Sequence, residues 1–306
     1  MSLDTYGLIE KSIYLYASKG FRGSYLLWKV FYIFKEPVRN TLLLPSGFPL
    51  YVNHNDWITR TAQQGTYERA LLHLLNRLRP SGAVIDVGAN IGITLFHALK
   101  GGEKDSLSLA FEPLSENLGS IELVKSHLKA NCIILPYAVG AKNFQSNLYG
   151  VENDLHSGGA SLRKHKAHNS SERIVEVVTL DSYLENLLTD RGVSLLKIDV
   201  EGYEAEVLIG ASHLIHSRRI ELLIIEVSPN FGETSYLNKL FDDLGPSYVW
   251  YELFESGNFQ RIPKLRKIGV EEAIAKSYQF NLCIFRTDAL DMIFGKKIDS
   301  SKVIRI

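Results

Sequence analysis

Residues 83–96 read AVIDVGANIGITLF, an apolar run that passes through a glycine-containing turn into a second apolar segment. The first part, AVIDV, has the uninterrupted apolar character of a strand that is buried on both faces. The second part is predicted as a helix, and a strand, a turn and a helix in this order begin a βαβ unit. The stretch therefore predicts a parallel sheet with a ligand site beyond the carboxyl end of this strand.

Short apolar strands and amphipathic helices alternate along most of the chain. Further strands are expected at 106–111, 132–139, 194–200, 220–227, 247–254 and 279–286, and helices at 66–79, 90–100, 114–128, 203–215 and 234–244. This alternation is typical of a doubly wound α/β domain. We expect a mostly parallel seven-stranded sheet with helices on both of its faces.

The chain divides into a main domain and two flanking segments. We expect an N-terminal cap at 1–60, the main domain at 61–290 and a C-terminal tail at 291–306. Residues 140–180 interrupt the alternation with a β-like pair around a polar loop. A long insertion in a compact fold is usually functional or disordered, and we expect this one to lie near the ligand crevice.

The N-terminal cap is predicted to contain two helices and a hairpin. The helices are expected near 3–18 and 22–36, where Pro37 ends the second, and the hairpin turns at Ser46-Gly47. Residues 1–40 are rich in aromatic residues and lysine, which suits packing on the main domain, contact with a membrane surface or a homodimer interface. Composition does not choose among these roles.

The composition points to a cytoplasmic globular protein. Lys+Arg and Asp+Glu each number 34, so no basic excess is present and no nucleic-acid partner is expected. The two cysteines, Cys132 and Cys283, lie in separate apolar runs, which predicts buried thiols rather than a disulfide. No secretion signal opens the sequence, and the apolar run at 25–34 is too short to cross a bilayer.

The turn DVGANIG at 86–92 is predicted to bind a nucleoside cofactor that carries positive charge. Its glycines, Gly88 and Gly92, lack the middle glycine of a dinucleotide motif. Asp86 would repel a pyrophosphate but attract S-adenosyl-L-methionine (SAM), whose ammonium and sulfonium groups are cationic. The next strand ends in Glu112-Pro113, where a carboxylate suits both ribose hydroxyls. A helix-capping role remains the alternative for both carboxylates.

Several segments of the sequence resemble the FkbM-type methyltransferase family in their order and spacing. The resemblance covers about residues 50–286, and its most distinctive part is LLKIDVEGYEAEVLIGA at 195–211. The other segments are GTYERALLHLL, AVIDVGANIGIT, LAFEPLSEN, LPYAVG, SGGASL, TLDSYL and LLIIEV. The resemblance implies a Rossmann-like class I methyltransferase fold and transfer of a methyl group from SAM, typically to a hydroxyl of a sugar, polyketide or other natural product.

The same resemblance implies positions for the cofactor. The methionine end would be surrounded by Asp86, Gly88, Asn90 and Gly92, the ribose would be held at Glu112-Pro113, and the adenine would lie near Ala138. Tyr67 and Glu68, before the first core helix, are placed to reach the amino group. Their alternative role is that of a solvated helix start.

The segment KIDVEG at 197–202 supplies candidate catalytic residues. Lys197, Asp199 and Glu201 alternate and so share one face of an extended chain, and Glu226 ends the neighbouring strand. An alcohol needs a general base or a metal ion to become nucleophilic. We expect Asp199 or Glu201 to act as the base, and Lys197 either to orient the carboxylates or simply to pair with one of them inside the strand. The alternative is that Asp199, Glu201 and Glu226 bind Mg²⁺.

The insertion supplies one further candidate, His156, beside the flexible SGGASL segment at 157–162. We expect this loop to touch a small-molecule hydroxyl acceptor, with His156 as a second candidate base. His165 and His168 form only a weak metal motif within a polar loop. Two other functions stay open from the sequence, an NAD-dependent oxidoreductase and a SAM-binding regulator without catalysis.

Overall fold

The computed structural model describes most of the 306-residue chain. The residues outside the description are 1–3, 6, 24–25, 28–29, 31–40, 52–55, 103–105, 151–157, 165–171, 186, 189–191, 230–233, 259, 296 and 300–301. They include His156, His165 and His168, and most of the helix predicted at 22–36 together with Pro37, so those predictions lie outside the described residues.

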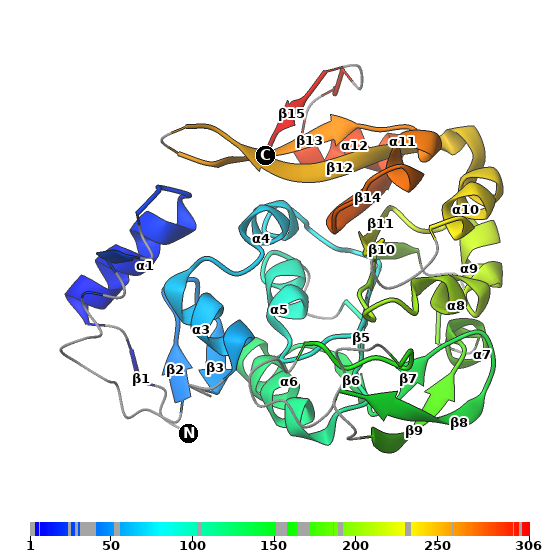
Figure 1. The fold of residues 1–306 in the computed structure, drawn as a ribbon, viewed down its shortest axis with the longest axis horizontal. Coiled ribbons are helices and arrows are strands. Elements are labelled where there is room, and N and C mark those ends of the chain that lie inside the picture. The colour runs from blue at the N-terminus through cyan, green and yellow to red at the C-terminus, as the bar shows by residue number, and fades with distance from the viewer. Residues whose placement is uncertain are drawn as a thin grey trace.

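A mixed sheet forms the centre of the molecule (Figure 1). In the described chain it has nine strands in the order β15-β13-β12-β14-β11-β10-β4-β5-β6. Their bounds are β4 Ala83–Val87, β5 Ser108–Phe111, β6 Cys132–Leu135, β10 Val193–Ile198, β11 Leu222–Val227, β12 Tyr248–Ser256, β13 Ile262–Lys267, β14 Phe280–Arg286 and β15 Ile304–Arg305. The expected α/β class is therefore confirmed.

The prediction of a mostly parallel seven-stranded sheet was wrong in strand number and in direction. Strands β11, β10, β4, β5 and β6 are parallel, but β14, β12, β13 and β15 join antiparallel to their neighbours. Strand β13 reads IPKLRK, and its alternating half-buried pattern near the sheet edge lacks the continuous apolar run used to find strands. Strand β15 has only two residues, within the predicted tail at 291–306.

Helices cover both faces of the sheet, because consecutive strand residues point to opposite sides. Ile85 and Val87 pack in one core with α7 Leu180–Leu184, α8 Glu204–Ile209, α9 Ser212–His216 and α10 Tyr236–Leu244, next to α11 Val270–Ile274. Val84 packs in the other core with α4 Arg69–Leu75, α5 Ile93–Leu99, α6 Ser115–Leu128 and α12 Thr287–Phe294. A short 3₁₀ turn, η1 Gly245–Ser247, precedes β12.

Two predicted helices differ from the structure. The helix expected at 66–79 extends only over Arg69–Leu75, because Glu68 adopts a left-handed conformation with φ of 36°. The helix expected at 203–215 is divided into α8 and α9 around Gly210. A Cβ atom at Gly210 would lie 2.0 Å from the carbonyl oxygen of Gly140, so the chain needs glycine at this close contact.

The N-terminal cap contains the predicted hairpin. Strands β2 Thr41–Leu43 and β3 Pro49–Tyr51 are antiparallel around Ser46-Gly47, which confirms that prediction, and β1 Asp4–Thr5 pairs with β2. Helix α1 Leu8–Ser18 begins five residues later than the helix predicted at 3–18, and α3 is formed by Trp57–Gln64. In the part of the chain that is described, no helix is long and apolar enough to span a membrane.

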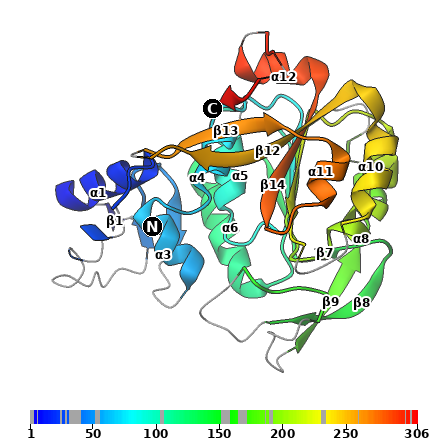
Figure 2. The same cartoon turned by 45° about the horizontal axis from the view of Figure 1, so that its top comes forward.

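The insertion forms a separate small sheet. Strands β8 Phe144–Tyr149 and β9 Glu172–Val178 are antiparallel, as the predicted β-like pair requires, and β7 Ala138–Val139 adds a parallel strand in the order β7-β9-β8. Both cysteines are buried and unbridged, as expected. Figure 2 shows this small sheet beside α8 and the β12–β13 hairpin reaching toward α1.

Candidate active site

A cavity opens at the carboxyl ends of the parallel strands β4, β5 and β10. Eleven of the predicted site residues line it: Tyr67, Glu68, Gly88, Asn90, Glu112, Pro113, Ala138, Lys197, Asp199, Glu201 and Glu226. Asp86 and Gly92 lie behind the wall of the cavity rather than at its surface. The structure therefore brings residues from six separate stretches of sequence to one place.

The turn after β4 is shaped by Gly88 and Asn90. Gly88 has φ of 81°, and a Cβ atom there would lie 1.9 Å from the carbonyl oxygen of Asp199. Only glycine permits this approach between the turn and the end of β10. Asn90 is also left-handed, with φ of 50°, and its Oδ1 accepts a hydrogen bond from the Ile91 amide at 2.7 Å. Gly92 has φ of 82° and precedes the first residue of α5.

Asp86 is buried beneath this turn and next to a lysine. It pairs across the β4–β10 register with Lys197, so both side chains lie on the same face of the sheet. Its Oδ2 accepts a hydrogen bond from Thr94 Oγ1 at 2.6 Å, whereas its Oδ1 has no hydrogen-bond partner among the described residues. Burial raises the pKa of Asp86, although Lys197 and Thr94 oppose that rise. Asp86 therefore contributes to the site indirectly, by stabilising the Lys197 cation and supporting the turn after β4.

Glu112 connects the ends of β4 and β5. Its Oε2 accepts from the Asn90 amide at 2.8 Å, and its Oε1 accepts from the Leu114 amide at 2.9 Å. Each carboxylate oxygen retains a further lone pair toward the cavity that Glu112 lines. Burial raises the pKa of Glu112 to about 7, and the two amide hydrogen bonds limit that rise.

The KIDVEG segment places a lysine and two carboxylates at the end of β10. Lys197 Nζ donates to Asp199 Oδ2 at 2.7 Å, and the lysine side chain is only 3% exposed. Burial lowers the pKa of Lys197, but the neighbouring Asp199 and Asp86 carboxylates raise it above its ordinary value. Lys197 is therefore a permanent cation that holds Asp199 in position.

Glu201 and Glu226 complete this group. Glu226 ends β11 beside the end of β10, and its carboxylate lies with those of Asp199 and Glu201, with oxygens within 4.8 Å of one another. Burial first, and then Asp199 and Glu204, raise the pKa of Glu201 to about 8. Burial first, and then the Asp199 and Glu201 carboxylates, also raise the pKa of Glu226. Two of the three groups therefore bind protons more tightly than ordinary carboxylates.

The insertion reaches this site through Ser161. Its Oγ donates to the backbone oxygen of Glu201 at 2.7 Å, and its own backbone pairs with Tyr149 of β8. Glu201 has φ of 55°, which is an uncommon conformation for a residue with a side chain. The Ser161 contact supports that conformation and fixes the Gly158–Leu162 segment along the cavity wall.

Glu68 also lines the cavity, and it is held by a residue that the sequence did not single out. Its Oε2 accepts from Asn281 Nδ2 at 3.0 Å, and burial raises its pKa. Gln279 also lines the cavity and hydrogen-bonds to Glu226. Asn281 belongs to β14, and Gln279 lies just before that strand. A local sequence pattern does not reveal that β14 lies antiparallel beside β11.

The cavity is strongly acidic. Among the described lining residues, Lys197 is the sole basic side chain, whereas five carboxylates line the wall: Glu68, Glu112, Asp199, Glu201 and Glu226. Glu226 Oε2 is buried without a hydrogen-bond partner in the described chain. This excess of carboxyl groups favours a cationic ligand, because a nearby positive charge stabilises their ionised forms. A metal ion is less well matched, because the Lys197 ammonium already occupies the cationic position beside Asp199.

The comparisons with known proteins add a family assignment to this geometry. The model of the FkbM methyltransferase domain matches residues 86–248, just over half of the 306 residues. No curated protein sequence matches the chain significantly.

Solved structures show only distant similarity to the chain. An rRNA methylase from Streptococcus thermophilus is 12% identical, over 71% of this chain and 93% of its own, with a TM-score of 0.37. A precorrin-6y C5,15-methyltransferase from Geobacter metallireducens is 12% identical, over 72% and 88%, with a TM-score of 0.36. A protein assigned as a methyltransferase and solved with S-adenosylhomocysteine (SAH) is 10% identical, over 82% and 57%, with a TM-score of 0.40.

One expectation from the sequence needs correction. The exclusion of nucleic acid as a partner was wrong, since the structures similar to this chain include proteins named as rRNA or RNA methylases. The exclusion rested on a net charge of zero, and a total charge says nothing of how charge is distributed over the surface.

Proposed function

The chain belongs to the FkbM methyltransferase family and is a SAM-dependent methyltransferase, and we propose that it methylates a hydroxyl group of a sugar, glycoside or other small natural product. The family assignment favours this function over the NAD-dependent oxidoreductase that the sequence left open. We also propose that the catalytic domain covers residues 61–290, with residues 1–60 as a cap on it.

The acidity of the cavity is the observation that carries the proposal. Five carboxylates and one lysine line a pocket at the carboxyl ends of the parallel strands, where open α/β sheets bind their ligands. The pocket suits a ligand with an ammonium and a sulfonium group and opposes a pyrophosphate.

The lining residues suggest how SAM would be held. Gly88 and Asn90 would border its methionine part, Glu112 would accept hydrogen bonds from the ribose hydroxyls, and Ala138 would border the adenine. Tyr67 and Glu68 would face the amino group. Asp86 and Gly92 would act from behind the wall, Asp86 by fixing Lys197 and Gly92 by shaping the turn.

We assign the general base to Glu201 in preference to Asp199. SAM supplies a methyl group on a cationic sulfur, which keeps the electron pair of the broken carbon–sulfur bond when the acceptor oxygen bonds to the methyl carbon. Glu201 lines the cavity and has a raised pKa near 8, so its carboxylate would accept the acceptor's hydroxyl proton near neutral pH. Asp199 is already hydrogen-bonded to Lys197, which makes it the better orienting group.

Mg²⁺ at Asp199, Glu201 and Glu226 is the less favoured alternative. Their oxygens lie close enough to share an ion. The ammonium of Lys197, 2.7 Å from Asp199, would repel a divalent cation at that position.

Calorimetric titration of the full chain with SAH tests the proposal, and NAD serves as the comparison ligand. We expect micromolar binding of SAH, no binding of NAD and loss of SAH affinity in a Glu112→Ala variant. A Glu185→Gln variant changes an exposed carboxylate outside the cavity and should bind SAH as the wild type does. Binding of NAD alone would contradict the proposal, whereas SAH binding without turnover on any acceptor would indicate a regulator.

A further inference from the structure

A second groove adjoins the cofactor cavity on the side of Glu68. It lies between the N-terminal segment, the start of α4 and the β12–β14 region, and Glu68 and Gln279 line both the groove and the cavity. The two spaces therefore meet at these two residues. Arg22, Arg261, Glu252 and Glu255 also line the groove.

The outer wall of the groove is made by docking residues 19–22 on the β12–β13 hairpin. Gln260 Nε2 donates to the Lys19 oxygen at 2.7 Å, and the Arg261 amide donates to the Gly20 oxygen at 2.9 Å. A Cβ atom at Gly20 would lie 2.3 Å from the Arg261 oxygen, so this contact depends on glycine. The backbone contact brings Arg22 and Arg261 to the same groove.

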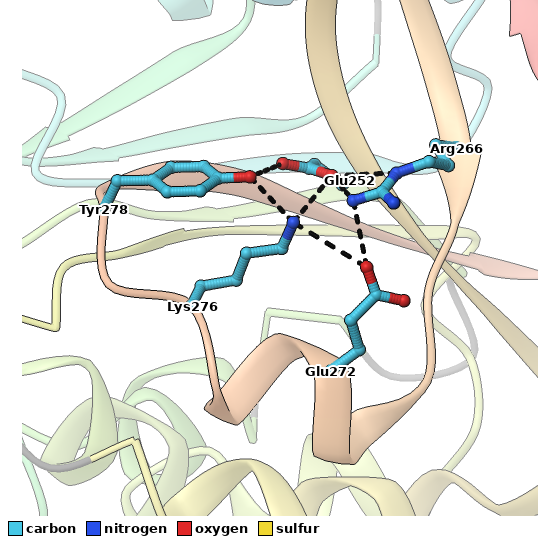
Figure 3. Close-up of polar contacts among 5 residues, drawn as sticks. All are labelled: Glu252, Arg266, Glu272, Lys276 and Tyr278. Atoms are coloured by element: carbon cyan, nitrogen blue, oxygen red, sulfur yellow. Dashed lines mark hydrogen bonds and ion pairs between the residues drawn. The ribbon is translucent and has the colours of Figure 1, made fainter.

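The carboxylates that line the groove are each engaged by a neighbour. Glu255 forms an ion pair with Arg69, and Glu68 accepts a hydrogen bond from Asn281. Glu252 is the most heavily engaged, as Figure 3 shows: it interacts with Arg266, Lys276 and Tyr278. Little unpaired negative charge from these groups therefore faces the groove.

Two cations of the groove, by contrast, are available to a ligand. Arg22 and Arg261 are both exposed, and neither side chain forms an ion pair with another described residue. Guanidinium groups bind carboxylate and phosphate with paired, charge-assisted hydrogen bonds. The outer part of the groove is therefore basic, whereas the cofactor cavity that it meets is acidic.

We propose that this groove is the acceptor site and that the acceptor is a small sugar carrying an anionic group, a phosphate or a carboxylate, which Arg22 and Arg261 bind. The acceptor's hydroxyl would then enter the cavity past Glu68 and Gln279. This proposal rests on the proposed function, since it names the substrate class of the same enzyme.

The test compares binding of three probes to the full chain saturated with SAH. The probes are glucose 1-phosphate, glucuronate and the neutral methyl α-glucoside, and a short single-stranded RNA is added as a fourth ligand. We expect either anionic sugar to bind about tenfold more tightly than the neutral one, as a charge-assisted hydrogen bond to arginine would give. The affinities of glucose 1-phosphate and glucuronate, compared with each other, show whether the groove prefers phosphate or carboxylate.

Variants of the two arginines test whether these residues cause the preference for an anionic sugar. Arg22→Ala and Arg261→Ala should each remove most of the preference for the anionic sugar without changing affinity for the neutral one or for SAH. Arg60→Ala, at an exposed arginine of α3 that lines neither space, is the matched control and should change nothing.

Three results would overturn the proposal. They are equal or absent binding of the charged and neutral sugars, a preference that persists when both arginines are replaced, and binding of RNA in place of the sugars. If the wild type does not bind SAH, the proposed function is contradicted instead. The failure of the acceptor-site proposal can therefore be distinguished from the failure of the proposed function.

Discussion

Replacing Glu201 with glutamine should change how the stability of the protein depends on pH. Burial and the neighbouring Asp199 and Glu204 carboxylates raise the pKa of Glu201 from 4.5 to about 8. At about 1.4 kcal/mol per pKa unit, ionising Glu201 in the folded protein costs about 5 kcal/mol more than in the unfolded chain. Glutamine has nearly the same shape and does not ionise, so it removes this cost.

The sign of the effect follows from the raised pKa. The folded state holds the proton more tightly, so its stabilising contribution is complete below pH 4.5 and is lost as pH rises to about 8. Between pH 6 and pH 9 the wild type should lose about 2 to 3 kcal/mol of unfolding free energy through this group. The Glu201→Gln variant should lose correspondingly less, and it should be the more stable protein at pH 9.

Urea denaturation at pH 6, 7, 8 and 9 measures this difference. The quantity of interest is the difference between variant and wild type. Glu226 also has a raised pKa, in part because of the Glu201 carboxylate, so replacing Glu201 should also reduce the slope that Glu226 contributes. Glu185→Gln, at an exposed position, provides the control for loss of a charge as such. Parallel curves for wild type and Glu201→Gln would refute the reasoning. With an acceptor in hand, the same variant should lose methyl transfer, and the wild-type kcat should rise with pH to a plateau above about 8.

Three further predictions concern the same site. Gly88→Ala should lower the unfolding free energy by at least about 2 kcal/mol and abolish SAH binding, because φ is 81° and the new Cβ would lie 1.9 Å from the Asp199 oxygen. Gly119→Ala, in α6 with nothing within 4 Å of the new Cβ, should instead stabilise by up to about 1 kcal/mol, and urea denaturation compares the two. Lys197→Met should destabilise by about 3 to 5 kcal/mol by leaving the buried Asp86 without its cation, which would be seen as a lowered denaturation midpoint. Methyl transfer should continue in the presence of EDTA, because Lys197 supplies the cation beside Asp199. If EDTA abolishes activity and Mg²⁺ restores it, a metal ion acts at this site instead.

The part of the fold that the sequence predicts well is the part built from local signals. The stretch AVIDVGANIG contains a fully buried strand and three residues with positive φ, the last of which directly precedes a helix, and each of these features has a local signature. The order Lys197, Asp199, Glu201 likewise follows from the alternation of an extended chain. These elements lie as predicted, and their side chains meet at one cavity.

The parts that the sequence missed depend on long-range pairing. Asn281 reaches Glu68 because β14 lies antiparallel to β11, and no local pattern reveals that neighbour. Asp86 lies opposite Lys197 in the strand register and does not line the cavity, an arrangement that depends on the pairing of β4 with β10. The division of α8 from α9 depends on the close approach of Gly140 to Gly210, two positions far apart in the chain.

The contact of Gln260 with Lys19 has a consequence for biosynthesis. The two residues are 241 positions apart, so on the ribosome Lys19 emerges long before its partner. The outer wall of the groove is therefore completed late, after the parallel strands β4 to β11 have been synthesised. Few backbone hydrogen bonds hold this wall, and amide hydrogens at Gly20 and Arg261 should exchange with solvent sooner than those of β4 and β10. A wall that is completed late in synthesis would then also open readily in the mature protein.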